Sequence, residues 1–403
     1  MSDDPGSGAG RSRIGMALAG GGPAGAIYEI GALRALEEAV EGLDATRADV
    51  YVGVSAGSFV AACLANGVTS KQLCRATFEN DPRLLPFKSE AFFRPALLGY
   101  CRQAWMVPGL VLDALRDYAS NPKDQSLFES LIRMTRALPV GLFDNEPIGA
   151  YLRKIFQIEG RTDDFLELRS RLFVVAADLD SGKAVRFGEP GMDHVPISLA
   201  VQASSALPGL YPPVEIDGRH YVDGVLLKTL HASVALDAGA QLLFCLNPIV
   251  PIDTSDSIAD GVMRRGKLVH RGLPTVLSQT FRTLVYSRLS TGLASYAPRY
   301  PGSDLILLEP DRDDYRMFFT NVFKLSNRRS VCEHAYNTTR RQLRRRCEEL
   351  EPILEKHGLR LRVDVLEEER ELEASLAARR QPREPVTQEL ERTLDRLEQL
   401  LHP

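Results

Sequence analysis

Residues 14–66 alternate between short apolar segments and helical periodicity, and this alternation restricts the possible fold more than any other feature of the chain. The apolar runs at 14–18 and 50–54 have the length and composition of buried strands, and helical patterns follow them at 24–40 and 56–66. Along the first helix, the apolar side chains recur every three or four residues: Ile27, Ile30, Leu33, Leu36 and Val40. Because only a few residues join strand to helix, the two strands are predicted to be parallel neighbours.

The rest of the chain resumes this pattern after an interruption. Further strands are expected at residues 172–177, 220–222, 242–246 and 305–308. Further helices are expected at residues 148–158, 197–206, 272–295 and 328–356. We therefore predict an α/β fold, with three α/β/α layers built around a central, mostly parallel sheet.

Changes in composition predict the domain organisation. Residues 1–12 are small and polar and are expected to be disordered, and residues 13–250 are expected to form the main domain. Within it, the proline-rich stretch 80–145 is predicted to be an inserted helical cap. Residues 251–366 are expected to form a helical extension that packs on the core, and residues 367–403 a charged helical tail. The tail carries leucines on one face that either dock on the body or pair two copies into a homo-oligomer: Leu390, Leu394, Leu397 and Leu401.

Composition excludes several classes of protein. A net charge of -4 argues against a general nucleic-acid-binding protein, which should be basic. No apolar run reaches the roughly 18 residues that span a bilayer, and the N-terminus lacks the apolar core of a signal peptide. The six cysteines have no C-x-x-C spacing, so we expect reduced, buried thiols. These features predict a cytoplasmic protein, either soluble or attached peripherally to a membrane.

The pentapeptide at residues 53–57 is the strongest chemical signal. It reads Gly53-Val54-Ser55-Ala56-Gly57, a G-x-S-x-G pattern between an apolar strand and a helix of small residues. Such a serine lies on a sharp strand-to-helix turn that only small neighbours permit, and its hydroxyl points outward. The N-terminus of the helix behind it favours developing negative charge. Ser55 is therefore a candidate nucleophile, with Gly53 and Gly57 as the glycines of its elbow; the alternative is a purely structural turn.

The glycine-rich segment Gly20-Gly21-Gly22-Pro23-Ala24-Gly25 fits two interpretations. As G-x-G-x-x-G it matches a dinucleotide fingerprint, but no acidic residue ends the second strand, and Pro23 removes one N–H from the loop. As an oxyanion hole it would present backbone N–H groups to an acyl oxygen. Parallel neighbouring strands would bring this loop beside Ser55. Gly20, Gly21 and Gly22 are therefore candidate oxyanion-hole residues.

A serine nucleophile needs a base, and the sequence offers two kinds. None of the seven histidines lies in a recognisable motif: His194, His220, His231, His270, His334, His357 and His402. Asp223 ends a short apolar segment and precedes Gly224, which places its carboxylate at a sheet edge. The alternative for Asp223 is an ordinary turn aspartate.

Taken in order, the glycine-rich segment, the Ser55 pentapeptide and Asp223-Gly224 resemble the patatin-like phospholipases. The segment at 203–213, which contains Ser204-Ser205-Ala206-Leu207-Pro208, and the segment Ala176-Ala177-Asp178-Leu179 are similar to that family as well. The resemblance covers roughly residues 14–250. It implies a patatin-like fold and an enzyme that hydrolyses acyl esters of phospholipids, lysophospholipids or neutral lipids, with no metal and no cofactor.

The resemblance also implies roles for particular residues. Ser55 would attack the ester carbonyl, Asp223 would take its proton in a Ser–Asp dyad, and the N–H groups of the glycine-rich loop would hold the oxyanion. Two residues depart from the family pattern: Ala24 stands where a basic residue is frequent, and Val225 where Gly or Ala is usual. A free aspartate is a weak base, with a pKa near 3.9, so burial that raises the pKa of Asp223 would help.

Two other functions remain possible from the sequence: a small-ester hydrolase with a Ser-His-Asp triad, and a catalytically weak member that binds lipid or acts as a scaffold. For a lipid hydrolase, residues 84–112 offer an apolar and basic landing surface for a membrane or lipid aggregate, or else the core of the cap. The arginines between 328 and 346 are expected to form a solvated helix face balanced by acidic residues 367–371, with phosphate binding as the alternative.

Overall fold

A computed structural model describes residues 11–78, 94–95, 140–254, 268–314 and 325–377. The chain divides into two units, residues 1–367 and residues 368–403. Within the second unit the described residues contain one short helix, α15 (Leu372–Ala377). Everything below concerns the first unit. The cap predicted at 80–145 and the landing surface predicted at 84–112 lie almost wholly outside the described residues, as does the leucine-bearing tail.

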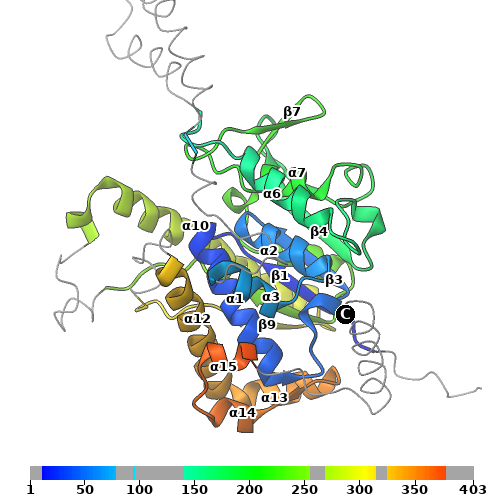
Figure 1. The fold of residues 1–403 in the computed structure, drawn as a ribbon, viewed down its shortest axis with the longest axis vertical. Helices are drawn as coiled ribbons and strands as arrows, with labels where there is room; N and C mark the ends of the chain where they lie inside the picture. Colours follow the sequence, from blue (N-terminus) through cyan, green and yellow to red (C-terminus); the bar gives the residue numbers. More distant parts are fainter. Residues whose placement is uncertain (1–10, 79–93, 96–139, 255–267, 315–324, 378–403) are drawn as a thin grey trace, which may run out of the picture. The chain divides into compact units, whose positions relative to one another are not determined.

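The centre of the first unit is a twisted sheet (Figure 1). Its path is β6-β7-β4-β3-β1-β8-β9, with β5 paired to β4. The pairs among β4, β3, β1, β8 and β9 are parallel, whereas β5, β6 and β7 are joined by antiparallel pairs. These strands are β1 (Ile14–Leu18), β3 (Val50–Val54), β4 (Arg171–Asp178), β5 (Ala184–Phe187), β6 (Val214–Ile216), β7 (Arg219–Asp223), β8 (Leu242–Leu246) and β9 (Asp304–Leu308).

Burial explains why these residues form the sheet. Every side chain of β1, β3 and β8 is buried, as expected for parallel strands covered on both faces. The strands predicted at 14–18, 50–54 and 242–246 are therefore confirmed. β9 pairs in register with β8, so residues beyond 251 contribute a strand to the central sheet as well as helices.

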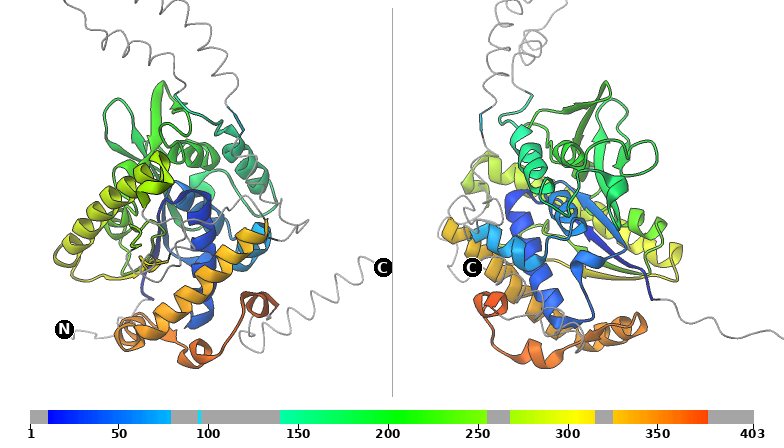
Figure 2. Two further views of the ribbon diagram at one scale, coloured as in Figure 1. Left: turned by 90° about the vertical axis from the view of Figure 1, so that its left-hand side faces the viewer. Right: turned by 45° about the vertical axis from the view of Figure 1, so that its right-hand side comes forward.

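Helices cover both faces of the sheet, which confirms the three-layer α/β/α prediction (Figures 1 and 2). α1 and α2 lie on one face, where α2 packs on β1, β3 and β4. α8 packs on β1, β3 and β8. The described helices of this unit are α1 (Gly22–Ala39), α2 (Ala56–Ala65), α3 (Ser70–Phe78), α6 (Glu146–Phe156), α7 (Ile197–Ser204), α8 (Ala232–Asp237), α10 (Leu273–Arg299), α12 (Leu325–Arg345), α13 (Cys347–Lys356) and α14 (Val363–Glu367).

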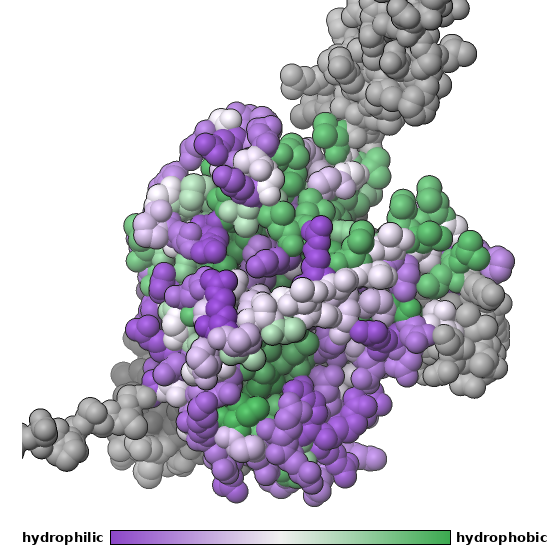
Figure 3. Space-filling model, turned by 180° about the vertical axis from the view of Figure 1, so that it is seen from behind, coloured by the Kyte–Doolittle hydropathy of each residue, from purple (hydrophilic) through white to green (hydrophobic). Residues whose placement is uncertain are grey.

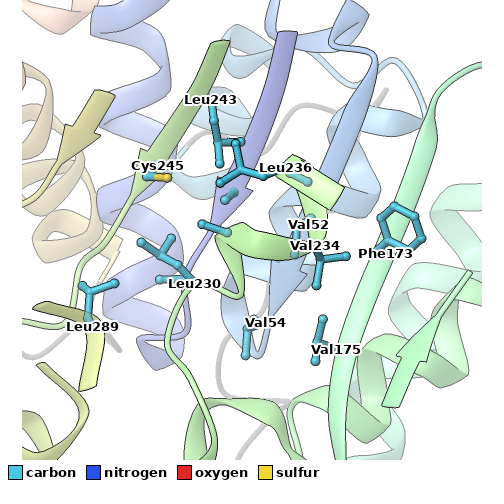
Figure 4. Close-up of a cluster of buried hydrophobic side chains, with 14 of the residues drawn as sticks. Val52, Val54, Phe173, Val175, Leu230, Val234, Leu236, Leu243, Cys245 and Leu289 are labelled. Carbon is cyan, nitrogen blue, oxygen red and sulfur yellow. The ribbon is translucent and has the colours of Figure 1, made fainter. Parts of the chain in front are cut away.

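A hydrophobic core lies between the sheet and the α8 side of the unit (Figure 4). Val52, Val54 and Val175 point into it from β3 and β4, and Val234 and Leu236 come from α8. Leu289 of α10 completes this cluster from much further along the chain. α10 is therefore fixed to the core through its middle, and this fixes the position of the residues one to three turns before Leu289.

The first helix differs from its prediction at its end. Val40 was expected on the helix face; that prediction is wrong, because α1 stops at Ala39 and Val40 begins the two-residue strand β2 (Val40–Glu41). β2 pairs antiparallel with β10 (Arg360–Leu361), which draws the chain into a small second sheet. Pairing with a distant segment overrides the helical spacing at this position.

The segment 328–356 also differs from its prediction, because it forms two helices. α12 ends at Arg345, and Arg346 leaves helical geometry while its guanidinium donates to the carbonyl of Leu307. The expected solvated arginine face is correct only in part: Arg329, Arg341, Arg344 and Arg345 are exposed, whereas Arg328 and Arg340 are buried. Arg340 is buried beside α1, where it meets the carboxylate of Glu38 at 3.5 Å, and α12 lies along α1 (Figure 2). These arginines hold helices together as well as facing water.

Surface and thiol features complete the description of the unit. No helix among the described residues is long and apolar enough to cross a membrane. Likewise, the described residues contain no group of three or more His, Cys, Asp and Glu side chains that could hold a metal ion. Cys63, Cys74, Cys245 and Cys332 are buried free thiols. The face seen in Figure 3 is mainly hydrophilic in its lower part, with apolar surface gathered higher up and to the right.

Candidate active site

The register of the sheet brings the predicted site residues to one place. Leu18 of β1 pairs with Gly53 of β3, so the glycine loop that follows β1 lies beside Ser55. On the other side of β3, Val54 pairs with Val175 of β4. The next residue of β4, Ala176, pairs with Asp223 of β7. The loop, the serine and the aspartate therefore meet at the carboxyl ends of β1 and β3.

Ser55 lies on a sharp turn between β3 and α2. Its φ of 52° and ψ of -126° are strongly disfavoured for a residue with a side chain, and this strain is typical of a nucleophile elbow. The two neighbouring glycines have no room for a side chain. A Cβ on Gly53 would lie 2.4 Å from the Ser58 Cα, and one on Gly57 would lie 2.4 Å from the Leu18 carbonyl oxygen. The close approach of α2 to β3 therefore requires glycine at 53, and its close approach to β1 requires glycine at 57.

Ser204, at the end of α7, connects the turn at Ser55 to β4 through hydrogen bonds. Its hydroxyl accepts a hydrogen bond from the Ser55 N–H at 2.8 Å and donates one to the Val175 carbonyl at 2.7 Å. Two residues later, the Ala206 carbonyl accepts the Asp223 N–H at 3.0 Å. One segment thus positions both candidate reacting residues. In the sequence this segment stands out only through the family resemblance, and nothing there predicts a role for Ser204.

Asp223 is the last residue of β7 and is buried. Its carboxylate accepts a hydrogen bond from the Val225 N–H at 2.9 Å. Burial raises the pKa of Asp223 to about 7, and interactions with the Ser55 side chain and the Val225 N–H oppose this rise only in part. The group is therefore close to half-ionised at neutral pH, unlike a free aspartate.

The glycine loop lies against the serine. A Cβ on Gly20 would be 3.1 Å from the Ser55 Cβ, and a Cβ on Gly21 would be 2.7 Å from the Pro248 ring. Gly22 begins α1 with φ +61°, a conformation that favours glycine. Within the part of the chain that the structure describes, the N–H groups of Gly21 and Gly22 donate to no protein acceptor. These N–H groups belong to the start of α1, where unbonded donors favour an anion.

Histidine is not part of this arrangement among the described residues. His231 is buried, but its ring nitrogen lies 3.3 Å from the Gly224 carbonyl, and burial lowers its pKa to about 4. His194 pairs with Asp217 at an exposed position, and His357 pairs with Asp304. No described histidine lines the cavity at Ser55.

A cavity of about 270 Å³ opens at Ser55 and Asp223. Its described lining is mainly apolar and includes Val225, which stands where Gly or Ala is usual in the family. α10 contributes part of the wall. The full described lining is Gly21, Gly22, Pro23, Ala26, Ser55, Ala56, Phe59, Ile148, Ser205, Leu207, Leu210, Tyr211, Asp223, Val225, Ile249, Ser278, Phe281 and Arg282.

A family model described as patatin-like phospholipase matches residues 16–236. Among solved structures, the chain is similar to VipD from Legionella pneumophila, with 16% identity over 83% of this chain and a TM-score of 0.36. It is also similar to the type III effector protein ExoU, with 14% identity over 83% of this chain and a TM-score of 0.33. The matches span 66% and 53% of those two chains.

Proposed function

The chain belongs to the patatin-like phospholipase family, and from this premise we propose that it is a lipid hydrolase that cleaves acyl esters with a Ser55–Asp223 dyad. The observation that carries the proposal is that the Ser55 side chain interacts with the buried Asp223 carboxylate and that both residues line one apolar cavity. The enzyme class would be a serine carboxylic ester hydrolase, and the chemistry would need no metal or cofactor.

In the proposed reaction, the Ser55 oxygen attacks the carbonyl carbon of the ester while its proton passes to Asp223. The tetrahedral intermediate then collapses to an acyl-enzyme, and the departing alcohol takes the proton back. Water, activated by the same carboxylate, attacks the acyl-enzyme and releases the fatty acid and free Ser55. Asp223 thus accepts and returns one proton in each half of the reaction: first from Ser55 to the departing alcohol, and then from water to the Ser55 oxygen.

The raised pKa of Asp223 supports its role as the base. A general base works best when its pKa lies near the working pH, and an ordinary aspartate lies about three units too low for neutral conditions. Burial brings the pKa of Asp223 to about 7. Burial of the site also excludes water, and this strengthens the attraction between backbone N–H groups and a developing oxyanion.

Gly21 and Gly22 would supply those N–H groups, with Gly20 allowing the loop to approach Ser55. Both glycines stand at the start of α1 and line the cavity, and this position supports the proposed role. Losing one such donor typically costs an acyl-transfer enzyme about 10²–10³ in rate.

We further propose that the substrate comes from a lipid aggregate or membrane surface, with the enzyme acting in the cytoplasm. The cavity lining suits an acyl chain, and α10 carries exposed apolar side chains next to the residues that line it, including Leu273, Leu277 and Leu284.

The test is fatty-acid release from a panel of lipid esters by the full chain, with Ser55→Ala and Asp223→Asn as controls. We expect both variants to lose at least about 10³ in kcat, as dyad members do when removed. A fluorophosphonate probe should label the wild-type protein at Ser55. A protein that folds but neither labels nor releases fatty acid would be a non-catalytic lipid-binding member. Loss of activity on replacing a single histidine, in a variant that still folds, would instead favour the Ser-His-Asp alternative.

A further inference from the structure

The segment that follows β8 packs against the glycine loop. Pro248 is the second residue after this strand, and its ring fills the space beside the loop. A Cβ on Gly21 would lie 2.7 Å from the Pro248 Cγ, and a Cβ on Gly25 would lie 3.0 Å from the same atom. The next residue, Ile249, lines the cavity of the candidate active site. Residues 247–249 therefore support the loop that is proposed to hold the oxyanion.

Asn247 sets the conformation of this segment. Its side chain is fully buried, its Oδ1 accepts the Ile249 N–H at 3.2 Å, and its Nδ2 donates to the Ile249 carbonyl at 3.1 Å. Such bonds from an asparagine to the backbone two residues later close a tight turn, here around Pro248. The same Nδ2 donates to a carboxylate oxygen of Glu309 at 3.1 Å. The position of Pro248 thus depends on Asn247, which is itself held by Glu309.

Glu309, the residue after β9, connects this turn to two helices. Its other carboxylate oxygen accepts the Tyr286 hydroxyl of α10 at 2.8 Å, and its backbone carbonyl accepts the Nε2 of Gln342 in α12 at 2.9 Å. The guanidinium of Arg312 lies over the Tyr286 ring, 4.6 Å from its centroid. Because both oxygens of the Glu309 carboxylate are bonded, the side chain has little freedom to rotate. It therefore fixes the turn at Asn247 relative to α10.

This network, made of Asn247, Glu309 and Tyr286, lies beyond residues 16–236, which the family model matches. Its effect on the glycine loop matters because oxyanion stabilisation is sensitive to distance. The N–H donors must lie about 2.7–3.1 Å from the place where the oxyanion forms. A displacement of about 1 Å in an active site can cost about 10² in rate. A support behind the loop therefore has a direct consequence for the reaction.

We propose that Glu309 is a positioning residue that acts through Asn247 and Pro248 on the loop proposed to hold the oxyanion. This inference rests on the proposed function, because the role of the loop is part of it. Glu309 is absent from the described lining of the cavity, so its effect on the reaction is indirect. The part of the chain that follows the family match is then a component of the active centre.

The first test is fatty-acid release from the lipid ester that the full-length wild type hydrolyses best. For Glu309→Leu we expect kcat to fall about 100-fold while KM stays within about twofold. Glu309→Gln and Tyr286→Phe should lower kcat by about tenfold or less, because each leaves part of the network intact. The matched control is Tyr300→Phe, which also removes a hydrogen bond from a tyrosine to a carboxylate, that of Asp237, and should resemble wild type.

The second test separates the oxyanion from the rest of the substrate. A long-chain trifluoromethyl ketone adds to Ser55 and forms an oxyanion, whereas an ether with the same alkyl chain only fills the cavity. For Glu309→Leu the inhibition constant of the ketone should rise about 100-fold, in step with the loss in kcat/KM, and that of the ether should stay within about twofold. Equal weakening of both compounds, or no change in either, would overturn the proposal.

Hydrogen exchange distinguishes failure of this inference from failure of the proposed function. In the segment 19–25, the N–H groups of Ala19 and Gly25 are hydrogen-bonded and report on the loop. Their exchange should be at least about tenfold faster in Glu309→Leu than in wild type, with exchange at residues 53–58 unchanged. Equal acceleration in both segments, or none at 19–25, would make Glu309 a purely structural residue and overturn the proposal.

If wild type neither releases fatty acid nor binds the ketone, the proposed function fails, and the exchange measurement alone decides whether Glu309 holds the loop. If Glu309→Leu does not fold, Glu309→Gln and Tyr286→Phe replace it in the same comparison with Tyr300→Phe. Faster exchange at 19–25 in these two variants, and not in the control, supports the proposal. Exchange like that of the control would overturn it.

Discussion

The buried carboxyl of Asp223 should make the protein less stable as the pH rises through neutrality. Folding raises its pKa from 3.8 to about 7, so between these values the folded protein holds a proton that the unfolded chain has lost. Stability falls with pH wherever the folded state binds more protons. The Asp223 contribution is thus fully present below pH 4 and is lost as the pH rises through about 7.

The size of the effect follows from the same two values. A difference of about three pKa units corresponds to about 4 kcal/mol over the whole range, at about 1.4 kcal/mol for each unit. Between pH 5 and pH 8.5 about two of these units are lost, which is about 3 kcal/mol. The Asp223→Asn variant cannot titrate at this position, and its amide oxygen can still accept the Val225 N–H.

The assay is urea-induced unfolding of wild type and Asp223→Asn at both pH values. All other titrating groups are shared and cancel in the difference, so the free energy of unfolding of wild type relative to the variant should fall by about 3 kcal/mol from pH 5 to pH 8.5. The activity of wild type should rise over the same range, because the base must be ionised. Two unfolding profiles that stay parallel in pH would refute the reasoning, since Asp223 would then have no raised pKa in the folded state.

Two further predictions concern the turn that carries the serine. Gly57→Ala should destabilise the fold by about 1–3 kcal/mol or more, because its Cβ would meet backbone oxygens at 2.4 Å. Gly22→Ala should cost about 1–2 kcal/mol, because the space around it is open and the only strain comes from its positive φ. Equal melting temperatures for the two variants would contradict this explanation. Ser204→Ala should cost about 1–3 kcal/mol by leaving the Ser55 N–H or the Val175 carbonyl without its partner, and should lower kcat more than it raises KM. An unchanged kcat, measured on any lipid that the enzyme hydrolyses, would show that Ser204 does not position Ser55.

The central sheet could be predicted because its signal is local. Parallel strands buried on both faces are short apolar runs, so β1, β3 and β8 were recognisable from composition alone. β5 and β6 were missed because they are short and only partly buried, although each pairs with the strand next to it in the chain. The break at Arg346 was missed for a different reason, since its cause is a contact with Leu307 from another element.

The residues of the candidate site likewise fall into those with a local sequence signal and those that depend on contacts with distant segments. Ser55 and the glycines around it stand in a contiguous motif, because a sharp turn restricts several adjacent residues at once. Ser204 carries no such signal, since a serine near the end of a helix is common, and its importance comes from the strand it touches. Arg282 is equally ordinary in sequence, and only the packing of α10 turns it toward the cavity.

The hydrogen bonds made by residues 204–206 have a consequence for how substrate preference can change. Ser204 accepts the Ser55 N–H, and Ala206, two residues later, accepts the Asp223 N–H. The distance between the nucleophile and the carboxylate is therefore set by one short segment. The wall supplied by α10 takes no part in that spacing. Substitutions along α10 can therefore alter which lipids are accepted while the reacting pair keeps its geometry, and this separation makes α10 the natural place to redesign selectivity.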